Sequence, residues 1–164
     1  MKKISMLAAC FLGISLAAPL QAAIFKDMAG KPAGLDDYTG KGKWLIVMIW
    51  ASDCHVCNKE AKNYNAFHLK HKDKDATVLG LSMDGQEKLA EAKKFIQQHG
   101  LVFPNIIGEP RDVAIRFTNL TGVEWAGTPT ILVYSPAGEL AVQQAGAVPI
   151  DIIEEFLAQQ QKPQ

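Results

Sequence analysis

Hydrophobic and polar positions follow two different periods along the chain, and the changes between these periods divide it into strands and helices. Trp44–Trp50 is a continuous apolar run rich in β-forming residues, which is typical of a strand buried on both faces. From Cys54 to about His71 the apolar positions recur three and four residues apart, which predicts a helix. Ala76–Ser82 predicts a second buried strand. The pattern predicts a second helix over about Gln86–His99, and Gly100 should end it.

The second half of the chain predicts a different arrangement of elements. The segment "LVFPNII" is extended but broken by Pro104, and "EPRDVAIRFTNL" predicts a short helix. The segment "TPTILVYSPAGELAVQQAG" indicates two antiparallel strands around a Ser-Pro-Ala-Gly turn. Pro149 should open a last helix to about Gln159. The apolar residues expected to point inward from this helix are Ile152, Ile153, Phe156 and Leu157. Crossover helices followed by a hairpin predict an α/β fold, with a mixed sheet and helices on both faces.

The first twenty-odd residues differ in composition from the rest of the chain. Lys2 and Lys3 precede a long apolar run without charge, and small residues follow near Ala22. This pattern predicts a secretory signal peptide over residues 1–22. Two alternatives stay open: an uncleaved membrane anchor, and lipid attachment at Cys10, where "LAAC" resembles a lipobox.

Residues 23–164 have the size and composition of one globular domain. The whole chain has 164 residues, of which 48% are hydrophobic, and 17 basic residues balance 17 acidic ones. No basic patch indicates nucleic acid or an acidic membrane as a partner. The Gly-rich and charged residues 23–43 predict a short strand or extended arm followed by turns. After loss of the signal peptide the cysteines that remain are Cys54 and Cys57.

The pair Cys54-His55-Val56-Cys57 has several chemical interpretations. Covalent haem attachment needs a histidine directly after the second cysteine, where this chain has Asn58. A zinc site would have to include His68 and His71, but eleven residues of helix span roughly 16 Å, so we expect these to be partly exposed helix residues. A crosslink over two intervening residues constrains little chain entropy. Binding of Cu(I) by the two thiols alone remains an alternative.

A redox dithiol fits the position of the pair between a strand and a helix. The first cysteine lies at the expected helix start, where unpaired N–H groups and the positive end of the helix dipole favour the thiolate. The second cysteine lies one turn inside the helix, shielded but close enough to attack. Cys54 is therefore predicted to be the nucleophile and Cys57 the resolving thiol.

Two motifs together resemble a known fold family. "WASDCHVC" resembles the Trp-Ala-x-x-Cys-x-x-Cys signature of thioredoxin-fold proteins, and "GTPT" at 127–130 resembles the cis-proline loop of that fold. The segments "DMAGKPAGLDDYTGKGKWLIVMIWAS", "VLGLSMDG" and "LVFPNI", with Glu60, are similar to the exported bacterial TlpA/ResA-like subgroup. The resemblance covers residues 25–157.

The resemblance implies a thioredoxin-like fold with a mixed sheet of four to five strands, and thiol–disulfide exchange with protein cysteines. It implies that Cys54 attacks and Cys57 resolves. It also implies that Trp50, the aromatic residue beside the site, docks the substrate peptide together with Thr128 and Pro129. It implies no cofactor beyond the redox-active disulfide and no metal. A periplasmic monomer is expected, acting as a reductase in cytochrome c maturation or disulfide repair. It would be recharged by an upstream membrane or periplasmic thiol donor.

Several positions depart from the thioredoxin pattern. Thioredoxins carry a buried acid two residues before the tryptophan, where this chain has Met48. Glu60 or Asp84 could replace that acid as the proton acceptor, although each is also typical of a solvated helix or turn position. His55, between the cysteines, could stabilise the Cys54 thiolate as an imidazolium or could be a solvated first-turn residue.

A peroxidase of the related peroxiredoxin type is a further enzyme interpretation. Its site would need a Pro-x3-Thr-x2-Cys arrangement. The residue three before Cys54 is Ala51, and no proline precedes it in that arrangement. The sequence therefore favours dithiol exchange over peroxide reduction.

Overall fold

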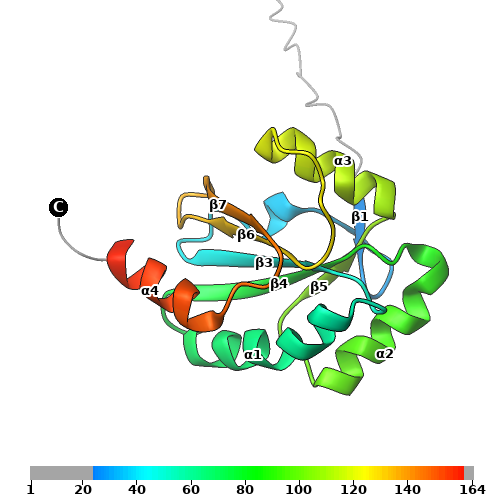
Figure 1. Cartoon of the computed structure of the whole chain (residues 1–164), viewed down its shortest axis with the longest axis horizontal. Helices are drawn as coiled ribbons and strands as arrows, with labels where there is room; N and C mark the ends of the chain where they lie inside the picture. Colours follow the sequence, from blue (N-terminus) through cyan, green and yellow to red (C-terminus); the bar gives the residue numbers. More distant parts are fainter. Residues whose placement is uncertain (1–23, 161–164) are drawn as a thin grey trace, which may run out of the picture.

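The computed structural model describes residues 24–160, which form one sheet with helices on both of its faces (Figure 1). The signal peptide expected over residues 1–22, and Cys10 within it, lie outside the described residues. The strands are β1 (Phe25–Asp27), β2 (Pro32–Ala33), β3 (Trp44–Trp50), β4 (Ala76–Ser82), β5 (Asn105–Ile107), β6 (Thr130–Tyr134) and β7 (Leu140–Ala145). The α-helices are α1 (His55–His71), α2 (Leu89–His99), α3 (Pro110–Thr121) and α4 (Ile150–Gln160).

The sheet has the order β2-β1-β5-β4-β3-β6-β7, with β3 and β4 at its centre. β3, β4 and β5 are parallel to one another, whereas β6 pairs with β3 and β7 pairs with β6 in antiparallel fashion. The parallel strands are joined by α1 and by α2, as crossover connections require. The fold expected from the sequence is therefore confirmed.

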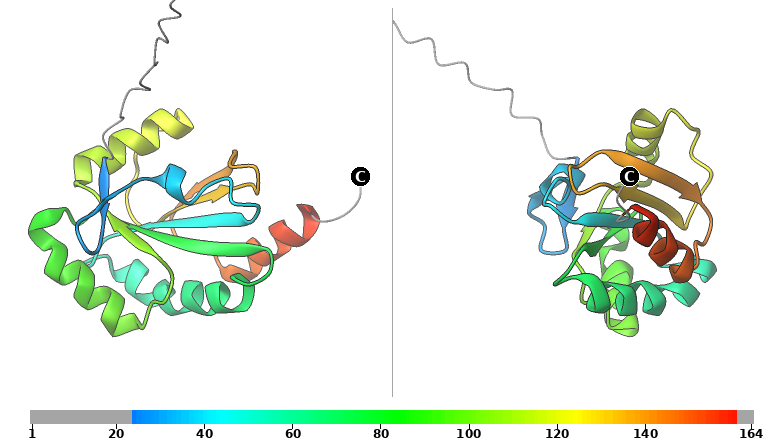
Figure 2. Two further views of the ribbon diagram at one scale, coloured as in Figure 1. Left: turned by 180° about the vertical axis from the view of Figure 1, so that it is seen from behind. Right: turned by 90° about the vertical axis from the view of Figure 1, so that its left-hand side faces the viewer.

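Alternation along β3 divides the core into two clusters, one on each face of the sheet. Ile46, Met48 and Trp50 pack in the cluster that contains buried residues of α1, α2 and α4. Leu45, Val47 and Ile49 pack in the other cluster with buried residues of α3. The two views of Figure 2 show α3 on the opposite side of the sheet from α1 and α2. Both faces of β3 are covered, which explains its uninterrupted apolar sequence.

Three details of the fold differ from the sequence prediction. The described sheet has seven strands rather than four to five, because β1 and β2 extend it beyond β5 as very short strands. The helix expected over 86–99 begins as a separate 3-10 turn at Gln86–Lys88 before α2 starts. Ile152 does not point inward: it is 52% exposed, because α4 turns Ile153 and Leu157, four residues apart, toward the core.

Among residues 24–160, no helix has the length and apolarity that crossing a bilayer would require.

Candidate active site

The two cysteines are joined by a disulfide at the start of α1. Their Cα atoms are 5.2 Å apart. Cys54 is the N-cap residue of α1, and its Sγ accepts a hydrogen bond of 3.1 Å from the backbone N–H of Cys57. Cys54 is partly exposed, whereas Cys57 is fully buried at 0% exposure. The first sulfur can therefore meet another molecule while the second cannot, because it lies beneath the first turn of the helix.

The floor beneath the disulfide is apolar. Met48 is buried in the same core cluster as Cys57, on the face of β3 that α1 covers. It stands at the position where thioredoxins carry the buried acid, and its neighbour in the parallel register of β4 is Gly80, which has no side chain. A proton acceptor for Cys57 must therefore come from another element or from water.

Trp50 supports the site from below and does not face a docked substrate. Its side chain is 0% exposed, and its ring stacks on Phe95 of α2 with ring centroids 4.2 Å apart. Its Nε1 donates a hydrogen bond of 3.2 Å to Oδ1 of Asn105 at the start of β5. The sequence interpretation of Trp50 as a docking residue is wrong for the structure as it stands, because neighbouring side chains cover the whole indole.

Asp84 ties down the loop that leads from β3 to Cys54. Its Oδ1 accepts hydrogen bonds from the backbone N–H of Ser52 at 3.0 Å and from the Ser52 hydroxyl at 2.9 Å. Its Oδ2 accepts a hydrogen bond of 2.7 Å from the hydroxyl of Ser82. Asp84 is only 8% exposed, so the expectation of a solvated turn residue is wrong. The carboxylate is occupied by these donors and holds the loop in place.

Asn58 holds the same loop from the other side. Its Nδ2 donates to the carbonyl oxygens of Ser52 at 3.2 Å and Cys54 at 2.9 Å. Its Oδ1 lies 2.9 Å from Nε2 of His99, the last residue of α2. Sequence reasoning missed both residues. An asparagine four residues after a helix N-cap indicates a side chain that can reach back to the capping loop, but no sequence signal pointed to His99.

The Thr128–Pro129 peptide bond is cis, as the resemblance implied. β6 begins at Thr130, which pairs with Ile49 near the carboxyl end of β3. Because the loop to Cys54 leaves the sheet at that same end, the cis peptide lies on the side of the sheet edge where the disulfide lies. Thr128 is partly exposed and Pro129 is buried. The carbonyl oxygen of Pro129 accepts a hydrogen bond of 2.8 Å from the N–H of Gly146.

His55 and Glu60 both lie near the start of α1. His55 is exposed in its first turn, directly after Cys54. Glu60 is partly exposed, and its Oε2 accepts a hydrogen bond of 3.1 Å from Nδ2 of Asn63. Glu60 lies one helical turn beyond Cys57 on α1, and its partial exposure leaves it accessible to solvent.

The histidines considered for zinc have other contacts. His68 is 6% exposed rather than partly exposed, and its Nδ1 accepts a hydrogen bond of 3.2 Å from the N–H of Val78 in β4. His71 lies 2.8 Å from a carboxylate oxygen of Asp75. Within residues 24–160 no three His, Cys, Asp or Glu side chains are grouped to hold a metal ion.

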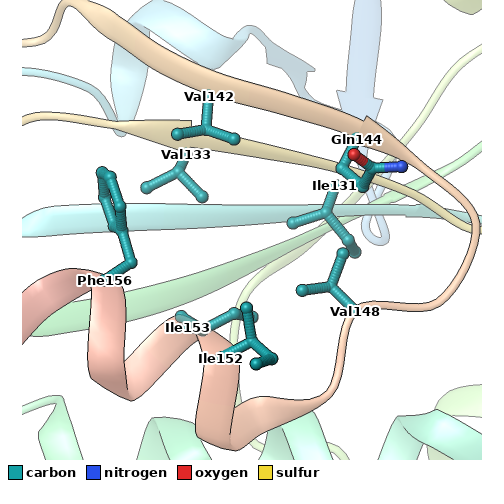
Figure 3. Close-up of a pocket in the computed structure, with 8 residues that line it drawn as sticks. All are labelled: Ile131, Val133, Val142, Gln144, Val148, Ile152, Ile153 and Phe156. Carbon is teal, nitrogen blue, oxygen red and sulfur yellow. The ribbon is translucent and has the colours of Figure 1, made fainter.

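An apolar hollow of about 170 Å³ lies between α4 and the strands β6 and β7 (Figure 3). Side chains from both strands and from the helix point into it, and the exposed Ile152 and Val142 lie at its border. None of the residues predicted for the site lines it. Its walls come from β6, β7, α4 and Val148 in the segment before α4.

Comparisons with known proteins point to one group. The thiol-disulfide oxidoreductase ResA of Bacillus thuringiensis (strain Al Hakam) is 32% identical over 90 residues, which cover 55% of this chain and 50% of that protein. ResA of Bacillus cereus (strain ATCC 10987) is 26% identical over 134 residues, which cover 82% of this chain and 72% of that protein. The first of these matches thus spans about half the length of the relative.

Structural comparison agrees with the sequence comparison. The thioredoxin domain of a thiol-disulfide oxidoreductase from Bacteroides vulgatus superposes with a TM-score of 0.64 at 26% identity, covering 82% of this chain and 94% of that chain. The sequence profile of the AhpC/TSA family matches residues 16–143, which is most of the chain. The resemblance noted in the sequence is thereby confirmed, and the chain belongs to the AhpC/TSA family, with a thioredoxin-like fold.

Proposed function

We propose that this protein is a thiol–disulfide oxidoreductase that exchanges its Cys54–Cys57 pair with the cysteines of other proteins. The observation that carries the proposal is the asymmetry of the pair. Cys54 is partly exposed and caps α1, whereas Cys57 is buried one turn further along. A structural crosslink has no need for one accessible sulfur beside helix N–H donors, but a nucleophilic thiolate does.

The exchange has two steps that conserve atoms and electrons. In the first, the Cys54 thiolate attacks a substrate disulfide, a Cys54–substrate disulfide forms, and the other substrate sulfur leaves as a thiolate that takes a proton. In the second, the Cys57 thiol loses its proton and its sulfur attacks Sγ of Cys54. The internal disulfide re-forms and the second substrate thiol is released, so two electrons pass from the dithiol to the substrate.

The substrate peptide has a docking place beside Cys54 in the loop of the cis peptide bond. Thr128 is partly exposed next to the carboxyl end of β3, and the carbonyl of the following Pro129 is already engaged by Gly146. This leaves the backbone of Thr128 as the group that a substrate strand would meet, by pairing of the β type. Trp50 supports this arrangement from beneath rather than by contact.

We further propose that the protein is exported and acts as a reductase in the periplasm. The basic and apolar pattern of residues 1–22 supports export, and similarity to ResA supports the class of reaction.

A monomer with no cofactor beyond its disulfide accounts for the chemistry, because the two sulfurs carry both electrons. Protein cysteines are the substrates, an upstream thiol donor restores the dithiol, and nucleic acid has no part. Cytochrome c maturation and disulfide repair are roles that such a reductase can fill.

Two assays test the proposal against its alternatives. In the first, the wild-type protein should catalyse insulin reduction by dithiothreitol and Cys54→Ser should not. In the second, the reduced protein is challenged with a thiol chelator after loading with Cu(I). Stoichiometric copper retention together with no insulin reduction would replace the proposal with a copper-binding dithiol.

A peroxidase would instead consume hydrogen peroxide, which we do not expect because Ala51 supplies no hydroxyl three residues before Cys54.

A further inference from the structure

Ser52 is the fixed point of the loop that carries Cys54. Its N–H and its hydroxyl both donate to the buried carboxylate of Asp84, and its carbonyl accepts from Asn58. The polar groups of this one loop residue are therefore engaged from two sides, by Asp84 in the bend after β4 and by Asn58 in α1. The Asn58 side chain also holds Cys54 itself, because the same Nδ2 donates a second hydrogen bond to the carbonyl of Cys54.

These bonds fix the orientation of the Asn58 amide. Both carbonyls lie on its Nδ2 side, at 3.2 and 2.9 Å, so the amide oxygen must face His99. An amide oxygen is an acceptor, and Nε2 of His99 lies 2.9 Å from it. His99 must therefore present Nε2–H, and in the neutral ring its Nδ1 carries the lone pair.

The surroundings of His99 favour that neutral tautomer. Its Nδ1 is buried and has no hydrogen-bond partner among the described residues, so a proton there would be buried without an acceptor. The ring packs against Phe95, with centroids 4.6 Å apart. Burial lowers the pKa of His99, and the nearby Lys62 acts in the same direction. A ring held in one tautomer gives Asn58 one stable orientation.

We infer that Asn58 and His99 are positioning residues for the exchange reaction, an assignment that rests on the proposed function. His99 orients Asn58, and Asn58 holds the carbonyls of Ser52 and Cys54 so that the Cys54 sulfur stays over the first N–H groups of α1. Asp84 holds the opposite side of the same loop. Neither Asn58 nor His99 reacts with the substrate.

The need for such a support arises when the disulfide opens. In the oxidised protein the bond to Cys57 keeps Cys54 in place. In the reduced protein that bond is gone, and the thiolate must stay within reach of the Cys57 N–H, which lies 3.1 Å from Sγ in the oxidised structure. The hydrogen bonds to the loop preserve this geometry, and the thiolate keeps its donor.

The test compares the reactivity of Cys54 in matched variants of the reduced full-length chain. Alkylation by iodoacetamide is followed across about pH 5–9, with labelled Cys54 located by fragmentation mass spectrometry. Asn58→Ala removes the support. Asn65→Ala is the matched control on the same helix: its side chain also ties backbone groups, those of Gly100 and Val102, and neither of these belongs to the loop that carries Cys54.

A second pair of variants separates the hydrogen bond of His99 from its packing. His99→Gln keeps an N–H donor at a position comparable to Nε2, whereas His99→Leu keeps the apolar bulk and loses the donor. Urea unfolding of every variant shows which of them are folded. Insulin reduction by the wild-type protein is measured in parallel.

Asn58→Ala and His99→Leu should alkylate Cys54 about three- to tenfold more slowly at neutral pH, the factor that one ordinary hydrogen bond is worth. The pH midpoint of alkylation should rise in both. His99→Gln should restore wild-type reactivity, and Asn65→Ala should lose stability without a change in Cys54 reactivity. Unchanged reactivity in folded Asn58→Ala, or equal slowing in Asn65→Ala, would overturn the inference. Absence of insulin reduction in the wild type would instead refute the proposed function, because alkylation requires no substrate.

Discussion

The indole Nε1 of Trp50 and the side-chain oxygen of Asn105 lie 3.2 Å apart in a buried hydrogen bond that crosses β4 from β3 to β5. This contact is possible because the residue between them on β4 is Gly80. A Cβ at Gly80 would lie 1.8 Å from Oδ1 of Asn105 and 2.8 Å from Nε1 of Trp50. The absence of a side chain on one central strand therefore allows the indole beneath the site to find its acceptor.

We expect Gly80→Ala to destabilise the protein by about 1–3 kcal/mol, because the new methyl group must displace Asn105 or Trp50 from a packed interior. Urea unfolding at neutral pH, with the disulfide intact, measures the change. Gly34→Ala is the control, because its backbone is extended and a Cβ there meets nothing closer than 4.0 Å. A Gly80→Ala protein as stable as Gly34→Ala would show that the interior accommodates the methyl group, and it would contradict the expected displacement of Asn105 or Trp50.

Much of the fold was predictable because the signals are local. β3 and β4 run over the predicted residues, and Gly100 ends α2 in the left-handed conformation with φ of 60°. Cys54 caps α1 at the position that helical spacing indicated. These features depend on side-chain periodicity and backbone preference within a few neighbours, which the sequence displays directly.

The supports of the site were not predictable in the same way. Asp84 and His99 lie far from Cys54 along the chain, and the fold brings Asp84 to Ser52 and His99 to Asn58. Asp84 follows a strand in a Gly-containing turn, where a solvated carboxylate is the ordinary expectation. Three hydroxyl and backbone donors, brought together by the fold, make its burial possible.

Glu60 is the candidate proton acceptor for Cys57, because Met48 supplies no base beneath the pair. Glu60→Gln should slow the resolving step by about tenfold or more and leave the first attack by Cys54 unchanged. The slowing should stay below the roughly hundredfold that a well-placed base contributes at least, because Glu60 is partly exposed and water can serve in part. Stopped-flow exchange with a small disulfide peptide across about pH 5–9 separates the two steps.

Two variants complete that experiment. Glu155→Gln on α4 is a control for loss of a carboxylate far along the chain from the site. Met48→Asp should speed resolution and lower stability, because a carboxylate would be buried in an apolar floor. Resolution at the wild-type rate in Glu60→Gln would remove Glu60 from the mechanism and leave water or the substrate as acceptor.

Stability should fall as the pH drops below about 6.5. Burial lowers the pKa of His68 and of His99 from the ordinary value of 6.5, so both rings resist protonation in the folded protein. The unfolded chain takes up protons first, and stability is lost as the pH falls through the unfolded value toward the folded one. The pKa values of Asp27 and Glu154 are also lowered, but from 3.8 and 4.5, so they act at lower pH.

Urea midpoints at about pH 7.5 and pH 5 measure this loss. His68→Asn should reduce the difference between the two midpoints, because an amide oxygen can accept the hydrogen bond of Val78 without titrating. A protein equally stable at both pH values, or more stable at the lower one, would contradict the assignment of neutral buried histidines.

Cys54 is the attacking thiol and Cys57 the resolving thiol, and trapping of a mixed disulfide tests these roles most directly. Reduced Cys57→Ser and reduced Cys54→Ser are each mixed with a disulfide-bonded substrate protein and quenched with acid. Mass spectrometry then identifies the adducts and the cysteine that carries each one. We expect Cys57→Ser to accumulate a disulfide between Cys54 and the substrate, and Cys54→Ser to form none. A stable adduct on Cys57 in Cys54→Ser, with no adduct on Cys54 in Cys57→Ser, would reverse the roles and contradict the account.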